Sequence, residues 1–150
     1  MSFSVAFTGH RTLSDDLNGK VVREIIEDAI RRGADTFYCG MACGFDLLCC
    51  WILSRLRKYY TFRVIACIPC RNQEKNFSVE DKILYAQMCE ACDEVVLLSE
   101  RYYNGCMQAR NRYMVDRADE VIAYLNDNRS GTGYTVRYAK EKGKKVIFVC

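Results

Sequence analysis

Histidine is almost absent from this chain: His10 is the only one among 150 residues. No serine, histidine and aspartate stand in the order of a hydrolase triad, and no nucleophile is apparent beside His10. The sequence has no G-x-x-x-x-G-K-[S/T] loop, whose lysine a phosphoryl transferase needs, and no G-x-G-x-x-G dinucleotide fingerprint. These absences favour a binding protein over an enzyme, although they leave enzyme activity open.

Long apolar runs and a strong charge imbalance are missing as well. No apolar stretch approaches the length of a membrane span, and the N-terminus lacks the basic region and apolar core of a signal peptide. We therefore expect a cytoplasmic location and no membrane partner. The net charge is +3, from 22 basic and 19 acidic residues. That excess is too small to indicate nucleic-acid binding by itself.

Cysteine, by contrast, is abundant, with ten residues. Cys67-x-x-Cys70 and Cys89-x-x-Cys92 have a spacing compatible with a zinc site. However, Cys67 lies in an apolar run, and the second pair lies late in an expected helix, whereas zinc ribbons place such pairs in turns. We therefore expect small buried cysteines in a reducing compartment, with no metal, no cofactor and no disulfide framework.

Apolar runs of strand type alternate with segments of helical periodicity along the whole chain. The expected strands are 3–7, 35–39, 62–68, 94–98, 120–125 and 145–149, and the expected helices are 17–32, 47–60, 79–91, 107–117 and 135–142. Ser14 and Asp15 are candidate caps of the first helix, and Ser78 is a candidate cap of the third. Near-continuous apolar strands are typical of a parallel sheet covered on both faces. The sequence therefore predicts a single α/β domain over residues 1–150, with three α/β/α layers and a mainly parallel sheet of about six strands.

Five loops follow strands of this expected sheet, and ligands of open α/β sheets bind at that edge. The loops span 8–11, 40–46, 69–73, 99–105 and 126–133. Two of them suit an anion, because Gly40 and Gly44 precede a helix and so does the segment Ser130-Gly131-Thr132-Gly133. Arg11 and Arg110 could hold phosphate oxygens. Together the loops predict a site for a phosphorylated nucleoside.

Further side chains of this edge suit a base or a sugar. Asn104, Asn111 and Asn126 could hydrogen-bond a base or a ribose, and Tyr102 or Tyr103 could stack on a base. The tyrosines could instead simply pack.

Several of the candidates have an ordinary structural alternative. His10 could hydrogen-bond within its own turn. Asp46 could favour the dipole of the helix that it begins. Arg110 could lie solvated on a helix surface.

These motifs resemble the YpsA-like branch of the SLOG superfamily, the Rossmann-like group that unites DNA-processing protein A with the LOG phosphoribohydrolases. The resemblance covers nearly the whole chain and is carried by Phe7-Thr8-Gly9-His10-Arg11, Gly40 to Asp46, Ile68-Pro69-Cys70 with Gln73, Met107 to Asp116, Ala118-Asp119 and Ser130 to Gly133. It implies a Rossmann-like fold and a nucleotide or nucleotide-derived ligand held by phosphate-cradling loops. The residues expected to contact that ligand are Thr8, Gly9, His10, Arg11, Gly40, Met41, Ala42, Gly44, Asp46, Arg110, Asn111, Ser130, Gly131, Thr132 and Gly133.

The same resemblance bears on catalysis. LOG enzymes cleave a ribose-phosphate from a nucleotide and need a glutamate shortly after a glycine motif that Ser130 to Gly133 resembles. Aligned on Gly131 and Gly133, that position holds Arg137 here. The departure argues for a sensor or regulatory module that binds its ligand without cleaving it.

Two alternatives stay open. The first is a nucleotide phosphoribohydrolase or N-glycosidase that uses Asp46 or Glu141 as its acid. The second is a DNA-associated protein, like DNA-processing protein A, with a basic stripe near 55–58 or 140–145. The candidate basic residues are Arg55, Arg57, Lys58, Lys140, Lys142, Lys144 and Lys145. Such clusters are equally typical of solvated helix ends. A homo-oligomer is also compatible with the resemblance, but no segment of the sequence locates its interface.

Overall fold

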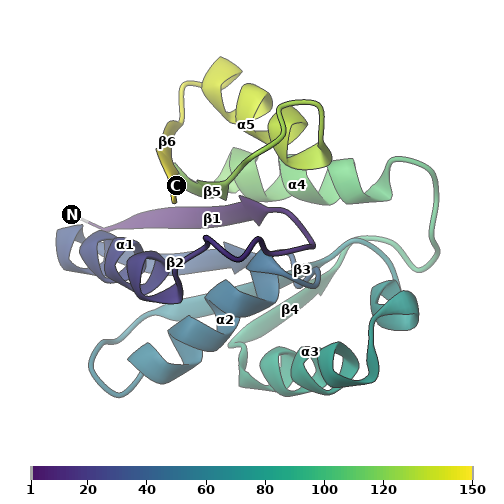
Figure 1. The fold of residues 1–150 in the computed structure, drawn as a ribbon, viewed down its shortest axis with the longest axis horizontal. Helices are drawn as coiled ribbons and strands as arrows, with labels where there is room; N and C mark the ends of the chain where they lie inside the picture. Colours follow the sequence, from purple (N-terminus) through teal and green to yellow (C-terminus); the bar gives the residue numbers. More distant parts are fainter. Residues whose placement is uncertain (1, 150) are drawn as a thin grey trace.

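A computed structural model describes residues 2–149 of the chain. Six strands form one parallel sheet in the order β4-β3-β2-β1-β5-β6 (Figure 1). The strands are β1 (Phe3–Gly9), β2 (Ala34–Cys39), β3 (Arg63–Ile68), β4 (Glu94–Leu97), β5 (Glu120–Tyr124) and β6 (Lys145–Phe148). The helices are α1 (Gly19–Arg32), α2 (Phe45–Leu56), α3 (Val79–Ala91), α4 (Cys106–Arg117) and α5 (Gly131–Glu141), with a short 3-10 helix η1 (Gln73–Asn76). The predicted Rossmann-like α/β fold with a parallel sheet of six strands is confirmed.

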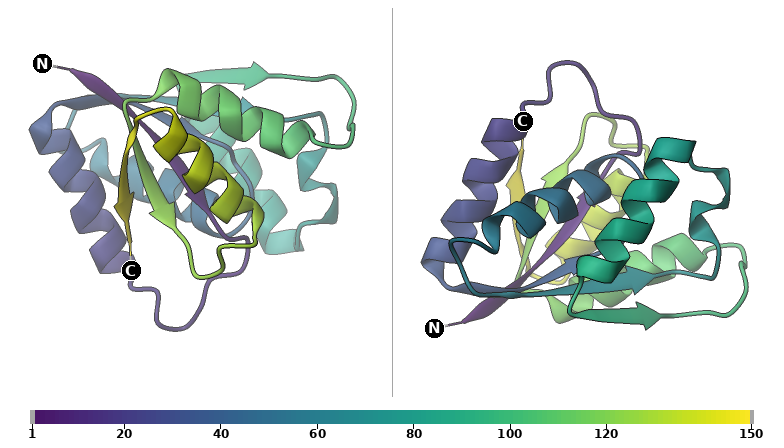
Figure 2. Two further views of the ribbon diagram at one scale, coloured as in Figure 1. Left: turned by 90° about the horizontal axis from the view of Figure 1, so that it is seen from above. Right: turned by 90° about the horizontal axis from the view of Figure 1, so that it is seen from below.

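The helices cover both faces of the sheet. Helices α1, α2 and α3 lie on one face, and α4 and α5 lie on the other (Figures 1 and 2). Successive strand residues point to opposite faces, so Phe7 belongs to the core under α2, whereas Ala6 belongs to the core under α4. This accounts for the nearly continuous apolar strands, since both sets of side chains are buried.

Aromatic rings fill the larger core. Phe7 stacks on Phe37 with ring centroids 5.8 Å apart, and Phe37 meets Phe62 edge to face at 5.5 Å. The opposite core combines the small side chains of Ala6, Cys67 and Ala118 with the larger Ile65 and Met114. Helix α4 packs on this core, and one of its polar side chains, that of Arg110, reaches backbone carbonyls of the strand ends.

The order of the strands changes direction at β1. From β1 the chain builds outward through β2, β3 and β4, and it then crosses back so that β5 pairs with the other side of β1. The loops after β1 and β5 consequently diverge and leave a crevice at the carboxyl edge, where ligands of such sheets bind. This is the right-hand side of the molecule in Figure 1.

Two expected helix starts are wrong. Asn18, not Ser14 or Asp15, caps α1, because its side chain accepts a hydrogen bond from the Lys20 amide. The Ser14 hydroxyl instead contacts the hydroxyl of Tyr124 at 2.7 Å. Helix α5 starts at Gly131 and not near residue 135, because Ser130 caps it.

The cap of α3 was predicted correctly, since the Ser78 hydroxyl accepts from the amide of Asp81. Gly33 ends α1 with a φ of 119°, a backbone conformation that favours glycine.

The cysteine pairs Cys67/Cys70 and Cys89/Cys92 lie at the end of β3 and at the end of α3. Within residues 2–149, no group of three or more His, Cys, Asp or Glu side chains is arranged to hold a metal ion. Likewise, no helix of this range is both long and apolar enough for a bilayer crossing.

Candidate functional site

A cavity of about 330 Å³ opens at the crevice between β1 and β5. Four parts of the chain supply its walls: the end of β1 with the following turn, the loop before α2 with the first turn of that helix, the first turns of α4, and the start of α5. Of the residues predicted from the sequence, the cavity is lined by Thr8, Gly9, His10, Arg11, Ala42, Asp46, Arg110, Asn111, Ser130, Gly131 and Thr132. Three of the five predicted loops, 8–11, 40–46 and 126–133, therefore meet at one cavity, whereas no residue of 69–73 or 99–105 lines it.

The N-terminus of α5 forms one wall. The hydroxyl of Ser130 accepts from the Gly133 amide (3.1 Å) and donates to the carbonyl of Asp127 (2.6 Å). The amides of Gly131 and Thr132, in the first turn, have no carbonyl one turn earlier to bond. Such amides, together with the positive end of the helix dipole, favour an anion.

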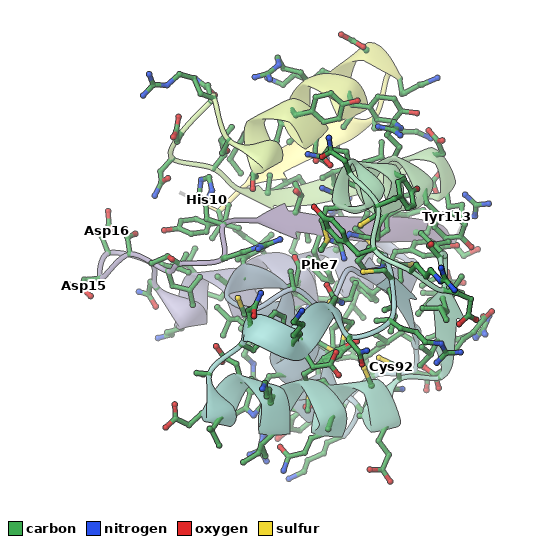
Figure 3. All side chains as sticks on the ribbon, turned by 90° about the vertical axis from the view of Figure 1, so that its right-hand side faces the viewer. Phe7, His10, Asp15, Asp16, Cys92 and Tyr113 are labelled. Carbon is green, nitrogen blue, oxygen red and sulfur yellow. The ribbon has the colours of Figure 1, made fainter. Side chains whose placement is uncertain are left out.

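The turn after β1 forms the opposite wall. The Asn126 amide donates to Nε2 of His10 (2.9 Å), and the imidazole lies edge-on against Tyr124 with centroids 5.4 Å apart. Figure 3, which faces the carboxyl edge, shows His10 between the loop after β1 and the segment leading to α5. His10 thus fixes the two sides of the crevice to each other while its ring lines the cavity. Arg11, next to it, is exposed and makes no ion pair with the described residues.

Asp46 places a carboxylate in the cavity wall. Its Oδ2 accepts from the Ala42 amide (3.3 Å), whereas Oδ1 is buried and has no hydrogen-bond partner among residues 2–149. Burial raises the pKa of Asp46 to about 6, a shift limited by the nearby Arg110 guanidinium and by the Ala42 hydrogen bond. The carboxylate is therefore only partly compensated by the protein.

Arg110 is buried, with 3 % of its surface exposed, so the alternative of a solvated arginine on a helix surface is wrong. Its Nη1 donates to the carbonyls of Gly40 and Cys67, and its Nε donates to the side-chain oxygen of Asn111. Burial lowers the pKa of this guanidinium from its ordinary value. Arg110 therefore ties α4 to the ends of β2 and β3, and it sets a positive charge behind the cavity.

Four of the predicted site residues do not line the cavity: Gly40, Met41, Gly44 and Gly133. The glycines instead permit close packing, since a Cβ on Gly44 would lie 2.3 Å from the Arg11 carbonyl oxygen, and one on Gly133 would lie 2.1 Å from that of Asn128. A Cβ on Gly40 would lie 2.9 Å from the side chains of Arg110 and Asp46. Met41 is fully buried. In this structure the loop before α2 offers Ala42 and Asp46 to the cavity.

Two lining residues, Met107 and Gln108, were not predicted from the sequence. They belong to the first turn of α4, which the loop after β4 aims at the crevice. A sequence feature could have identified them: both residues lie in the first turn after Gly105, the cap of a helix that begins on the carboxyl edge.

Glu141, the alternative acid, lies at the far end of α5. Ten residues separate it from the start of the helix, which is about 15 Å at the ordinary rise per residue. The two basic clusters named above lie in the last turns of α2 and α5 and in the segments that follow them, and thus toward the amino edge. One member, Arg57, is bound to Asp93 at 2.8 Å.

The fold is similar to that of larger proteins of known structure. DNA processing protein A from Streptococcus pneumoniae aligns with a TM-score of 0.73 and 23 % identity, over 97 % of this chain and 49 % of that one. The protein of the same name from Helicobacter pylori aligns with a TM-score of 0.70 and 20 % identity, over 97 % of this chain and 64 % of that one. The chain thus spans about half to two thirds of these proteins.

Sequence comparison gives a relative of similar size. The SPbeta prophage-derived protein YoqJ of Bacillus subtilis is 28 % identical over 138 residues, covering 83 % of this chain and 81 % of its own. A family model described as "YspA SLOG family" (YpsA) matches residues 14–148. Because the match covers most of the sequence, the chain belongs to the YspA SLOG family.

Proposed function

We propose that this protein binds a nucleotide or nucleotide-derived ligand in the cavity between β1 and β5 and acts as a sensor or regulatory module. One observation carries the proposal: a single cavity is lined by the free amides of a helix N-terminus, an unpaired arginine and an incompletely bonded carboxylate. An apolar metabolite would use none of these groups. A phosphorylated ribose has the complementary ones.

The charges of the cavity suggest how a nucleotide lies in it. Its phosphate fits the first turn of α5, where Gly131 and Thr132 supply amides, with the Arg11 guanidinium across the opening. A ribose hydroxyl can donate to a carboxylate, and with the phosphate at α5 we assign the sugar to the side of Asp46. Asn111, which donates to the Thr135 hydroxyl at 3.1 Å, borders the same cavity.

The proposal favours binding over cleavage because the cavity lacks a second acid. Among residues 2–149, Asp46 is the one carboxylate that lines it. Arg137 occupies the position at which LOG enzymes carry glutamate, and its Nη1 donates to the Asn128 carbonyl (2.6 Å). A hydrolase would have to protonate the base and stabilise the sugar with Asp46 alone.

Calorimetry with a nucleoside 5′-monophosphate, the same nucleoside and inorganic phosphate tests this function. We expect the monophosphate to bind at least about tenfold more tightly than the nucleoside, since phosphate contacts to arginine and amides are charge-assisted. Arg11→Gln should lower the affinity for the monophosphate, whereas Arg23→Gln, on the exposed face of α1, should leave it unchanged. Failure of any mononucleotide to bind folded protein, or equal affinity for the nucleoside, would contradict the proposal.

Incubation with the same nucleotides, followed by chromatography for free base, addresses the hydrolase alternative. We expect no base to be released. Release that disappears in Asp46→Asn would show instead that the cavity is an active site.

Binding of single-stranded DNA is the second candidate. The Helicobacter pylori neighbour is described by its single-stranded DNA binding mode, and here the cations Arg11, Arg112 and Arg137 lie at or beside the cavity. Oligonucleotide affinity that falls steeply as salt rises would support this candidate. The affinity should then fall in Arg112→Gln and stay unchanged in Arg55→Gln, on the other edge.

A further inference from the structure

Two larger hollows adjoin the cavity, one on each side. The first, of about 630 Å³, shares Arg11 and Met107 with the cavity and extends to η1; we call it the η1 hollow. The second, of about 620 Å³, shares Gln108, Ser130 and Gly131 with the cavity and extends along α5; we call it the α5 hollow. The two hollows share no lining residue with each other. The cavity therefore lies between them in a row.

Each hollow contains two aromatic side chains. Phe77 and Tyr102 line the η1 hollow, and Tyr103 and Tyr134 line the α5 hollow. Tyr102 and Tyr103 are consecutive residues of the loop between β4 and α4, so one short segment supplies a ring to both sides of the cavity. Their side chains are 68 % and 50 % exposed, and their ring surfaces are therefore free to stack.

Positive charge accompanies the rings. Arg11, Arg71 and Lys75 line the η1 hollow, and the arginines at 112, 129 and 137 line the α5 hollow. No aspartate or glutamate among the described residues lines either one. Arg71 and Arg129 pair with Glu100 and Asp127 outside the hollows. The remaining four cations are not neutralised by an ion pair within residues 2–149.

Two aromatic and cationic hollows on either side of an anion cavity match a molecule with two bases and phosphate between them. We infer that the ligand is a dinucleotide, two nucleosides joined through phosphate, whose bases stack in the η1 and α5 hollows while the cavity holds the linking phosphate. This inference rests on the proposed function and names its ligand class. A mononucleotide would occupy the cavity and only one of the two hollows.

The two tyrosines provide the test. Titration calorimetry compares a nucleoside 5′-monophosphate, a dinucleotide with a linking phosphate and a single-stranded 10-mer, at one salt concentration. We expect the dinucleotide to bind at least about tenfold more tightly than the monophosphate. Tyr102→Ala and Tyr103→Ala should each lower the affinity for the dinucleotide by about 5- to 150-fold, the range for losing one base–aromatic stack. The double variant should reduce its affinity to that of the monophosphate or below.

Tyr59→Ala is the matched control, because Tyr59 is as exposed as Tyr102 (67 %) but lies beyond the end of α2, on the amino edge. It should leave the affinity for the dinucleotide unchanged. All three tyrosines are surface residues, and a thermal melt establishes that each variant folds.

The outcomes separate the two levels of the argument. If no nucleotide binds, the proposed function fails. If the monophosphate binds and the dinucleotide gains nothing, or if both tyrosine variants bind the dinucleotide like the wild type, only the dinucleotide inference is overturned. Tighter binding of the 10-mer than of the dinucleotide would overturn it in favour of a nucleic-acid strand.

Discussion

The two edges of the sheet differ in how their arginines are partnered. On the amino edge, arginines are paired: Arg32 with Glu120 (2.8 and 3.0 Å), Arg57 with Asp93 (2.8 Å) and Arg63 with Glu94 (3.3 Å). On the carboxyl edge, the ion pairs of Arg71 and Arg129 are well exposed. Arg112 donates to the hydroxyl of Tyr134, and Arg137 donates to a backbone carbonyl. The partners of Arg112 and Arg137 are neutral, so the positive charge of these two arginines remains.

This difference agrees with the proposal that the ligand binds at the carboxyl edge. An ion pair at the start of a strand fixes a helix end or a neighbouring strand to it, and its neutralised charges attract an anion only weakly. Uncompensated guanidinium groups around a cavity raise the local potential and attract phosphate. With a net charge of only +3, the arrangement of the charges tells more than their number.

Arg110 is the exception, since it is a carboxyl-edge arginine with a structural task, and its removal should have the largest effect. Arg110→Met should lower the free energy of unfolding by about 3–5 kcal/mol, because it leaves buried carbonyls unpaired and Asp46 without its countercharge. Urea denaturation at pH 7 measures the change. Adding Asp46→Asn to this variant should restore part of the loss. If Arg110→Met changes the free energy of unfolding by less than about 1 kcal/mol, Arg110 does not have the structural role described here.

Asp46 should make the stability of the carboxyl edge depend on pH. Its pKa is about 6 in the folded protein, against 3.8 as the ordinary value, so the folded state binds the proton more tightly than the unfolded state. Protonation therefore stabilises the fold, and this contribution is lost as the pH rises from about 4 to above 6. The total is about 3 kcal/mol for a shift of about two units.

Urea denaturation of the wild type and Asp46→Asn across this range isolates the effect. The amide cannot ionise, and the variant should gain stability relative to the wild type as the pH rises. Two curves that stay parallel from pH 4 to pH 7 would show that Asp46 does not carry this titration.

A pair of ion-pair variants compares the edges directly. Glu120→Gln on the amino edge should lower the free energy of unfolding by about 1–2 kcal/mol, because the carboxylate is 12 % exposed and accepts two bonds from Arg32. Arg71→Ala on the carboxyl edge should leave unfolding unchanged within error, since Arg71 and Glu100 are both well exposed. Chemical denaturation of both variants without ligand measures the two changes. Equal losses of unfolding free energy would contradict the difference between the edges.

The fold follows closely from the sequence because both faces of the sheet are buried. Continuous apolar runs, separated by helical periodicity, define the order of elements without reference to tertiary contacts. The wrong starts of α1 and α5 have a local cause: Ser14, Asp15 and Asn18 are all good caps, and only the path of the chain decides among them. At α5, Gly131 and Gly133 made the first turn resemble a loop in the sequence, although the Ser130 cap stabilises it as a helix.

The candidate site was predictable as a set of loops but less so residue by residue. The alternation of strands and helices predicts the edge of the sheet at which the loops meet. It does not predict which residues of a loop line the cavity. Gly40 and Gly44 fit a phosphate loop in sequence, yet they serve the packing of Arg110 and of the turn at Arg11. Their role depends on segments up to 70 residues away, which no local pattern reveals.

The most direct test of the binding edge places one carboxylate at two equivalent positions. Gly131 and Gly19 are each the first residue of a helix, directly after Ser130 and Asn18 as caps, and a Cβ at either would meet nothing within 4 Å. Gly131→Asp and Gly19→Asp should therefore both fold, each stabilised by up to about 1 kcal/mol through the helix dipole.

The affinity of these two variants for a nucleoside monophosphate, measured by calorimetry, separates a helix start that lines the cavity, Gly131, from one that does not, Gly19. We predict that Gly19→Asp binds like the wild type and that Gly131→Asp loses at least about tenfold, close to 1.4 kcal/mol, because its carboxylate repels the phosphate. Equal affinity in the two variants would contradict the claim that the first turn of α5 holds the ligand's phosphate.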